Sequence, residues 1–295
     1  MANAYTGTTS LLSTPYLTVA EYKSAPTSID LDNLDYASQY PDDQDAELAN
    51  VIARASSWID SECNQVLAAT VENEQQRGRI RPDGSIIMHP RYNPIIALTS
   101  FQYGYPNTEL YSLGDCSIAW IEPQQIVIPQ TTVSWTSQGP LHFGLQSSPS
   151  TPIFMKYQYV AGYTNTLIAT AVATQSSLTV LNGTGIIAGQ ILKIYDGQYS
   201  ENVTVADTYV FGSTTVPLTS PLLYDHDPSV SISALPPAIK EAAILVTTAF
   251  LKVRGDSSMT MGIANSASLS QNLGGNLGEE IALAKQLVNP YKRVR

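Results

Sequence analysis

The histidine in "YDHDP" lies in the stretch that most resembles a metal site. Asp225 and Asp227 flank His226, and carboxylate and imidazole groups are both common metal ligands. Neighbouring side chains of a strand point to opposite faces, so three consecutive residues cannot converge on one ion without a special turn. The other two histidines, His89 and His142, lie tens of residues away. We therefore expect no metal and no cofactor, and we interpret this stretch as a polar turn.

Other residue patterns that could support catalysis have simpler interpretations. The glycines of "GTGIIAG", from Gly183 onward, lack GxGxxG spacing and lead into a strand, whereas a phosphate-binding loop precedes a helix. The pairs Asp42/Asp43 and Glu279/Glu280 suit helix starts, where the helix dipole favours negative charge. The GxSxG and HExxH motifs are absent. The sequence therefore predicts a protein that is not an enzyme.

The composition indicates extensive contact surfaces. Charged residues make up 14% of the 295 residues, against roughly 25% in an average soluble protein. Tyrosine outnumbers phenylalanine 17 to 5, and tyrosine suits subunit contacts, although it also suits ordinary strands. A net charge of −10 disfavours a surface that grips DNA but leaves open a channel through which DNA slides.

The cysteines and the lengths of the apolar runs indicate the cellular compartment in which the protein is made. Cys63 and Cys116 have no CxxC spacing, and we expect both to be free and buried. No apolar run approaches the roughly 18 residues of a membrane span, and the N-terminus lacks the layout of a secretion signal. We expect a protein made in a cytosol, with no membrane partner.

Helical periodicity marks the two ends of the chain. Residues 43–67 place apolar side chains at helical spacing after an acidic start. Residues 236–255 begin with two prolines, which suit a first turn, and end at a glycine. Residues 279–288 form a shorter amphipathic segment that Pro290 should end.

Between these helices the apolar period drops to two. Short β-rich runs are separated by Gly, Pro and turn residues, and Asp196-Gly197 predicts a tight turn between "ILKIY" and "ENVTV". Ser/Thr-rich flanks indicate an independent inserted domain. We therefore expect an α+β fold with four regions: 1–70, the N-terminal segment and helix; 71–169, β-rich; 170–235, an inserted β domain; and 236–295, the C-terminal helices and basic tail.

The order of these elements resembles the head-tail connector (adaptor) proteins of long-tailed bacteriophages. The resemblance rests on "TVAEYK", "ELANVIARASSWIDSECNQ", "LPPAIKEAAILVTTAFLKVRG" and "LAKQLVNPYKRVR", and it covers roughly half of the chain. It implies a connector core of N- and C-terminal helices, in a homo-oligomeric ring usually of twelve copies. It also implies a place in the virion neck after assembly in the host cytoplasm. There the ring would lie under the portal protein, meet a head-closure (stopper) or tail-terminator protein, and let double-stranded DNA pass.

Two groups of site residues follow. Residues 279–288 are too few for a stable isolated helix, so their apolar face needs a partner. The resemblance implies that this partner is the portal. The alternative is a basic tail frayed in solvent. The predicted portal-docking residues are Ile281, Ala284, Leu287, Val288, Tyr291, Lys292, Arg293 and Arg295.

Acidic residues near the N-terminus could line the channel of the ring, because an acidic lumen would not hold DNA. A solvated acidic turn explains these residues equally well. The predicted channel-lining residues are Asp30, Asp32, Asp35, Asp42, Asp43 and Asp45.

Two other functions stay open. The chain is alternatively a different neck or tail structural protein, such as a stopper or head-completion protein. Residues 170–235 are alternatively a glycan-binding module, which an exposed tyrosine platform in that block would favour.

Overall fold

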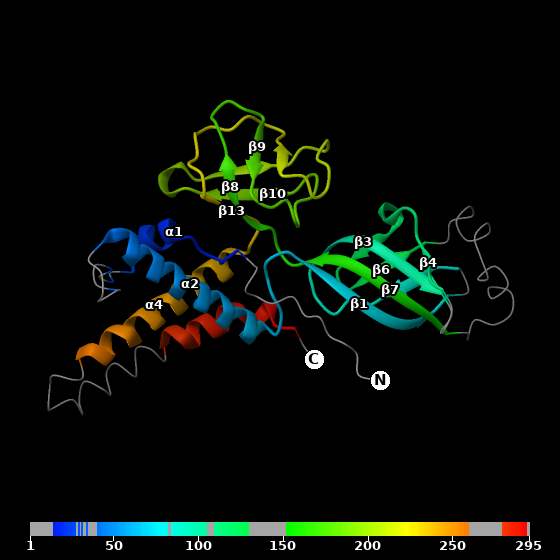
Figure 1. Ribbon diagram of the computed structural model, residues 1–295, viewed down its shortest axis with the longest axis horizontal. Helices are drawn as coiled ribbons and strands as arrows, with labels where there is room; N and C mark the ends of the chain where they lie inside the picture. Colours follow the sequence, from blue (N-terminus) through cyan, green and yellow to red (C-terminus); the bar gives the residue numbers. More distant parts are fainter. Residues whose placement is uncertain are drawn as a thin grey trace. The chain divides into compact units, whose positions relative to one another are not determined.

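The helices come from the two ends of the chain and the sheets from its middle, as the computed structural model shows (Figure 1). The structure describes residues 14–27, 29, 31, 34, 40–81, 84–104, 109–129, 152–259 and 279–293. The predicted α+β class is confirmed. The chain divides into two compact units: residues 69–163, and residues 10–68 together with 164–295.

The first described helix, α1 (Val19–Ser24), begins with a capping box. The Thr18 hydroxyl accepts a hydrogen bond from the backbone N–H of Glu21 at 3.1 Å, and the Glu21 carboxylate accepts one from the backbone N–H of Thr18 at 2.6 Å. These bonds satisfy two groups that have no partner within the helix itself.

The long helices α2 (Pro41–Cys63) and α4 (Pro237–Met259) pack against each other. Helix α2 ends four residues before the predicted position, because Asn64 adopts a left-handed conformation with φ 54° and caps it. Helix α4 continues past Gly255, the predicted end, because a glycine permits a helix stop without requiring one. The buried apolar residues of the two helices include Leu48, Val51, Ile52, Ala55, Ile59, Ile239, Ala242, Ala243, Val246 and Ala249.

The unit formed by residues 69–163 contains two antiparallel sheets. The larger has the strand order β1 (Thr70–Arg79), β7 (Pro152–Ala161), β3 (Ile95–Gly104) and β4 (Tyr111–Ser112). The smaller has the order β2 (Ile86–Met88), β6 (Gln125–Ile128) and β5 (Trp120–Glu122). A single core contains Met88, Phe101, Ile126, Met155 and Tyr157. This unit therefore has its own apolar centre.

The second β region is a curled half-barrel within the unit that also holds the helices. Its strand order is β11 (Glu201–Thr204), β10 (Ile191–Tyr195), β13 (Ser231–Ser233), β8 (Asn165–Thr170), β9 (Ser177–Val180) and β12 (Thr215–Pro217). A bridge between Val205 and Leu218 joins the ends of the two edge strands, which curls the sheet. Because β8 pairs with β13 and β9, this β region begins several residues before the expected boundary at residue 170.

Candidate functional site

The C-terminal segment packs on its own chain. Residues 279–288 are helical, and a 3-10 turn, η4 (Asn289–Tyr291), follows. Ala284 and Val288 are fully buried, while Ile281 and Leu287 are half-buried. Lys252 of α4 pairs with Glu280 at 2.5 Å. The predicted apolar stripe therefore has a partner within the chain, and docking on a portal stays a prediction.

Polar contacts fasten the end of this segment to the C-terminal end of α2. The backbone N–H of Arg293 donates to the carbonyl of Cys63 at 2.9 Å, and the Gln65 amide donates to the carbonyl of Tyr291 at 3.0 Å. Lys292 forms an ion pair with Glu62, which lowers the pKa of that carboxyl. The last carbonyls of a helix favour donors and positive charge, so this position suits a basic segment.

Three of the six predicted channel-lining residues are described, Asp42, Asp43 and Asp45, and all three lie near the N-terminal end of α2. Asp42 and Asp43 are exposed in the first turn of α2, which suits the helix dipole. Asp45 pairs with Lys23 at 2.5 Å. Asp30, Asp32, Asp35 and the basic residue Arg295 lie outside the described residues.

His226 is buried between two carboxylates that come from other parts of the half-barrel. Its Nδ1 lies 2.9 Å from Asp196 Oδ2 and its Nε2 lies 2.8 Å from Glu201 Oε1. Each ring nitrogen therefore has a carboxylate oxygen within hydrogen-bond distance. Because both ring nitrogens face carboxylates, neither is available to activate a nucleophile. The cluster therefore suits a role in holding the half-barrel together rather than general-base chemistry.

The flanking aspartates take no part in this cluster. The Asp225 carboxylate instead accepts a hydrogen bond from the backbone N–H of Ala173 at 2.7 Å, and Asp227 is exposed. The expectation that the three residues of "DHD" diverge therefore agrees with the geometry. In the part of the chain that the structure describes, no group of three or more His, Cys, Asp or Glu residues is arranged to hold a metal ion.

The His226 cluster also fixes a surface loop. Glu201 accepts hydrogen bonds from the backbone N–H groups of Leu223 at 3.1 Å and Tyr224 at 3.3 Å. The ring of Tyr224 lies 5.4 Å from the ring of Tyr199, measured between centroids. Sequence reasoning missed this arrangement, because His226 lies 30 residues after Asp196 and 25 residues after Glu201, with no motif spacing.

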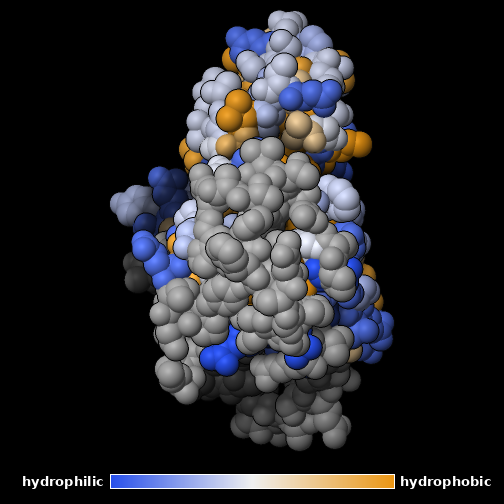
Figure 2. All heavy atoms as spheres, turned by 90° about the vertical axis from the view of Figure 1, so that its right-hand side faces the viewer, coloured by the Kyte–Doolittle hydropathy of each residue, from blue (hydrophilic) through white to orange (hydrophobic). Residues whose placement is uncertain are grey.

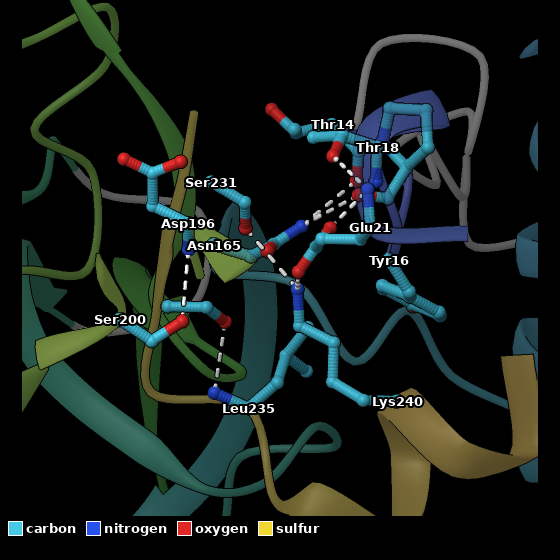
Figure 3. Close-up of polar contacts among 12 residues, drawn as sticks. Thr14, Tyr16, Thr18, Glu21, Asn165, Asp196, Ser200, Ser231, Leu235 and Lys240 are labelled. Carbon is cyan, nitrogen blue, oxygen red and sulfur yellow. Dashed lines mark hydrogen bonds and ion pairs between the residues drawn. The ribbon is translucent and has the colours of Figure 1, made fainter. Parts of the chain in front are cut away.

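A second buried cluster joins the helices to the half-barrel. Lys240 of α4 donates to Glu21 at 2.7 Å and to the Ser231 hydroxyl at 3.1 Å (Figure 3). Its ammonium group also lies 4.1 Å from the centroid of the Tyr195 ring, within range of a cation–π contact. Burial lowers the pKa of Lys240, and the Glu21 carboxylate opposes that effect. The cluster therefore connects four elements, α1, α4, β10 and β13, through one desolvated charge.

The two cysteines differ in their surroundings. Both are free, but Cys63 is buried and Cys116 is only half-buried, so the expectation that both are buried is wrong for Cys116. Burial raises the pKa of Cys63 to about 12. A thiol with so high a pKa is a poor nucleophile at neutral pH.

Comparison with known proteins yields no match. No family model matches the sequence, and no curated protein or solved structure matches it. None of the helices in the described ranges has the length and apolar content needed to cross a bilayer.

Proposed function

We propose that this chain is a structural protein of the neck of a long-tailed bacteriophage particle, a connector whose copies form a ring under the portal and join capsid to tail. The observation that carries the proposal is the packing of helices from opposite ends of the chain. Helices α1, α2, α4 and residues 279–288 belong to one compact unit, while a separate β unit interrupts the sequence between them. This is the order of elements on which the resemblance rests.

An exposed apolar hairpin supports contact between copies. Among the residues that the structure describes, strand β5 pairs on one side only, with β6, and its side chains are exposed along its length. Trp120 is 62% exposed and Ile121 is 38% exposed. Successive strand residues point to opposite faces, so both faces of β5 present apolar surface. Such surface at an open sheet edge is typical of protein contacts.

The decisive experiment is the mass of the purified protein in solution, measured alone and with the portal protein of the same phage. We expect a closed multimer, formed either alone or on the portal, and rings in electron micrographs of the particle neck. A chain that stays monomeric under both conditions, and is monomeric in mature particles, contradicts the proposal. Crosslinking to the tail tube rather than the portal would favour the stopper or head-completion alternative.

Replacing Trp120 and Ile121 together by alanine is expected to weaken ring assembly by at least about tenfold, because aromatic anchors dominate interface energetics. Both side chains are exposed, so the melting temperature of the monomer should change by less than about 2 °C. Light scattering against protein concentration measures the assembly. The matched control is Leu181→Ala, an exposed apolar residue of the half-barrel. Equal assembly by the double variant and the wild type would show that β5 is not a subunit contact.

A further inference from the structure

Tyr199 and Tyr224 form an aromatic pair at the surface of the half-barrel. Their ring planes are inclined by 54°, and the residues are 47% and 40% exposed. Neither hydroxyl has a hydrogen-bond partner among the described residues. Figure 2 shows that apolar side chains, in orange, reach the surface of the half-barrel at the top of that view. The tyrosine pair leaves ring surface open to a ligand.

Both tyrosines are attached to one buried anchor. Tyr199 ends the 3-10 turn η3 (Gly197–Tyr199), and its backbone N–H donates to the carbonyl of Asp196 at 2.8 Å. The backbone N–H of Tyr224 donates to Glu201. Asp196 and Glu201 are the two carboxylates that hold the buried ring of His226. The two loops are thus fixed relative to each other before any ligand arrives, which reduces the ordering cost of binding.

The charge around the pair restricts the ligand. The two loops, residues 196–201 and 223–228, contain four acidic residues, one histidine and no lysine or arginine. Such a surface repels phosphate groups, so nucleic acids and anionic lipid headgroups fit poorly. The Asp196 side chain is 28% exposed, and its Oδ1 has no partner among the described residues. A carboxylate oxygen in this position accepts hydrogen bonds from hydroxyl groups.

We propose that this surface binds a neutral oligosaccharide. The electron-rich faces of Tyr199 and Tyr224 attract the slightly positive C–H groups of a pyranose ring, and the nearby carboxylates accept hydrogen bonds from its hydroxyls. Two rings whose centroids lie 5.4 Å apart offer a stacking surface on the scale of one or two sugar units. The site belongs to the half-barrel alone and does not depend on ring formation.

The test begins with the full-length protein on an array of neutral oligosaccharides built from glucose, galactose, mannose and N-acetylglucosamine. Titration calorimetry then measures the affinity for a retained oligosaccharide. Tyr199→Ala and Tyr224→Ala should each weaken binding by about tenfold, the scale of losing one stacked ring. Tyr199→Phe and Tyr224→Phe should stay within about threefold of the wild type, because the ring face makes the stacking contact.

The control is Phe211→Ala, which removes an exposed aromatic ring elsewhere on the half-barrel and should leave the affinity unchanged. Thermal melts of every variant show whether the half-barrel is still folded. Failure to retain any of these oligosaccharides at millimolar concentration overturns the proposal. Binding that survives both alanine substitutions also overturns it. If the alanine variants lose assembly instead, and no sugar binds, the tyrosine pair is a protein contact.

Discussion

A Lys240→Met variant is expected to have a free energy of unfolding about 3 kcal/mol below that of the wild type, because it leaves the Glu21 carboxylate buried without its cation. The two side chains are 7% and 9% exposed, so water cannot replace the lost partner. Methionine keeps most of the apolar stem of lysine, so the loss reports on charge rather than on a cavity. Denaturant unfolding followed by Trp58 fluorescence measures the helical unit, in a background where Trp120 and Trp135 are phenylalanine.

Two controls separate the buried charge from general effects. Adding Glu21→Gln to Lys240→Met should restore part of the loss, since glutamine keeps the capping bond to Thr18 without a buried charge. Lys23→Met breaks the exposed pair with Asp45 and should cost less than about 1 kcal/mol. A loss for Lys240→Met no greater than that for Lys23→Met would mean that the buried pair contributes nothing to stability.

The helices were predictable because local rules and packing agree there. Leu48, Val51, Ile52 and Ile59 have helical spacing, and all four are buried. The end of α2 was placed too late, because a left-handed Asn64 is a choice of backbone conformation that apolar spacing does not reveal.

Strand β1 was harder to see because its sequence, "TVENEQQRGR", contains Val71 as its only large apolar side chain. Two tyrosines of β7 bind its Glu74 side chain: the hydroxyl of Tyr159 donates to Glu74 at 2.5 Å, and that of Tyr157 donates to Glu74 at 3.0 Å. Burial, with Glu74 adding to it, raises the pKa of both tyrosines. Apolar periodicity cannot detect a strand whose inward contacts are hydrogen bonds made by a partner far away in sequence.

The candidate sites show the same limit. "YDHDP" drew attention to His226, but its partners Asp196 and Glu201 come into position only when β10, β11 and the loop before β13 assemble. The apolar face of residues 279–288 was recognisable from its spacing, yet its partner in α2 was not, because residues 225 positions apart along the chain, such as Cys63 and Val288, make that contact. Residue types and spacing identified His226 and the apolar face of residues 279–288 as candidates. The contacts that they make depend on the long-range topology, which spacing does not reveal.

A buried carboxyl in α2 gives the second large effect, on the pH dependence of stability. Asp60 accepts hydrogen bonds from the hydroxyl of Tyr16 and from the backbone N–H of Leu67. Burial raises the pKa of Asp60 from 3.8 to about 6, although these two hydrogen bonds act in the opposite direction. The folded protein therefore holds this proton more tightly than the unfolded chain does. Between pH 3.8 and about 6 the unfolded chain has fewer protons bound, so the free energy of unfolding falls as the pH rises.

An Asp60→Asn variant tests this effect, because asparagine keeps an acceptor for Tyr16 and Leu67 without a charge at any pH. Raising a pKa from 3.8 to about 6 corresponds to about 3 kcal/mol. We expect the variant to match the wild type near pH 4 and to exceed its free energy of unfolding by up to about 3 kcal/mol at pH 7. Denaturant unfolding of both proteins at several pH values, again followed by Trp58, gives this difference directly, and effects of other titrating groups cancel. Asp207→Asn, at an exposed position, should differ from the wild type by less than about 0.5 kcal/mol throughout. A difference for Asp60→Asn that stays constant between pH 4 and pH 7 would show that this carboxyl is ionised in the folded protein at no cost.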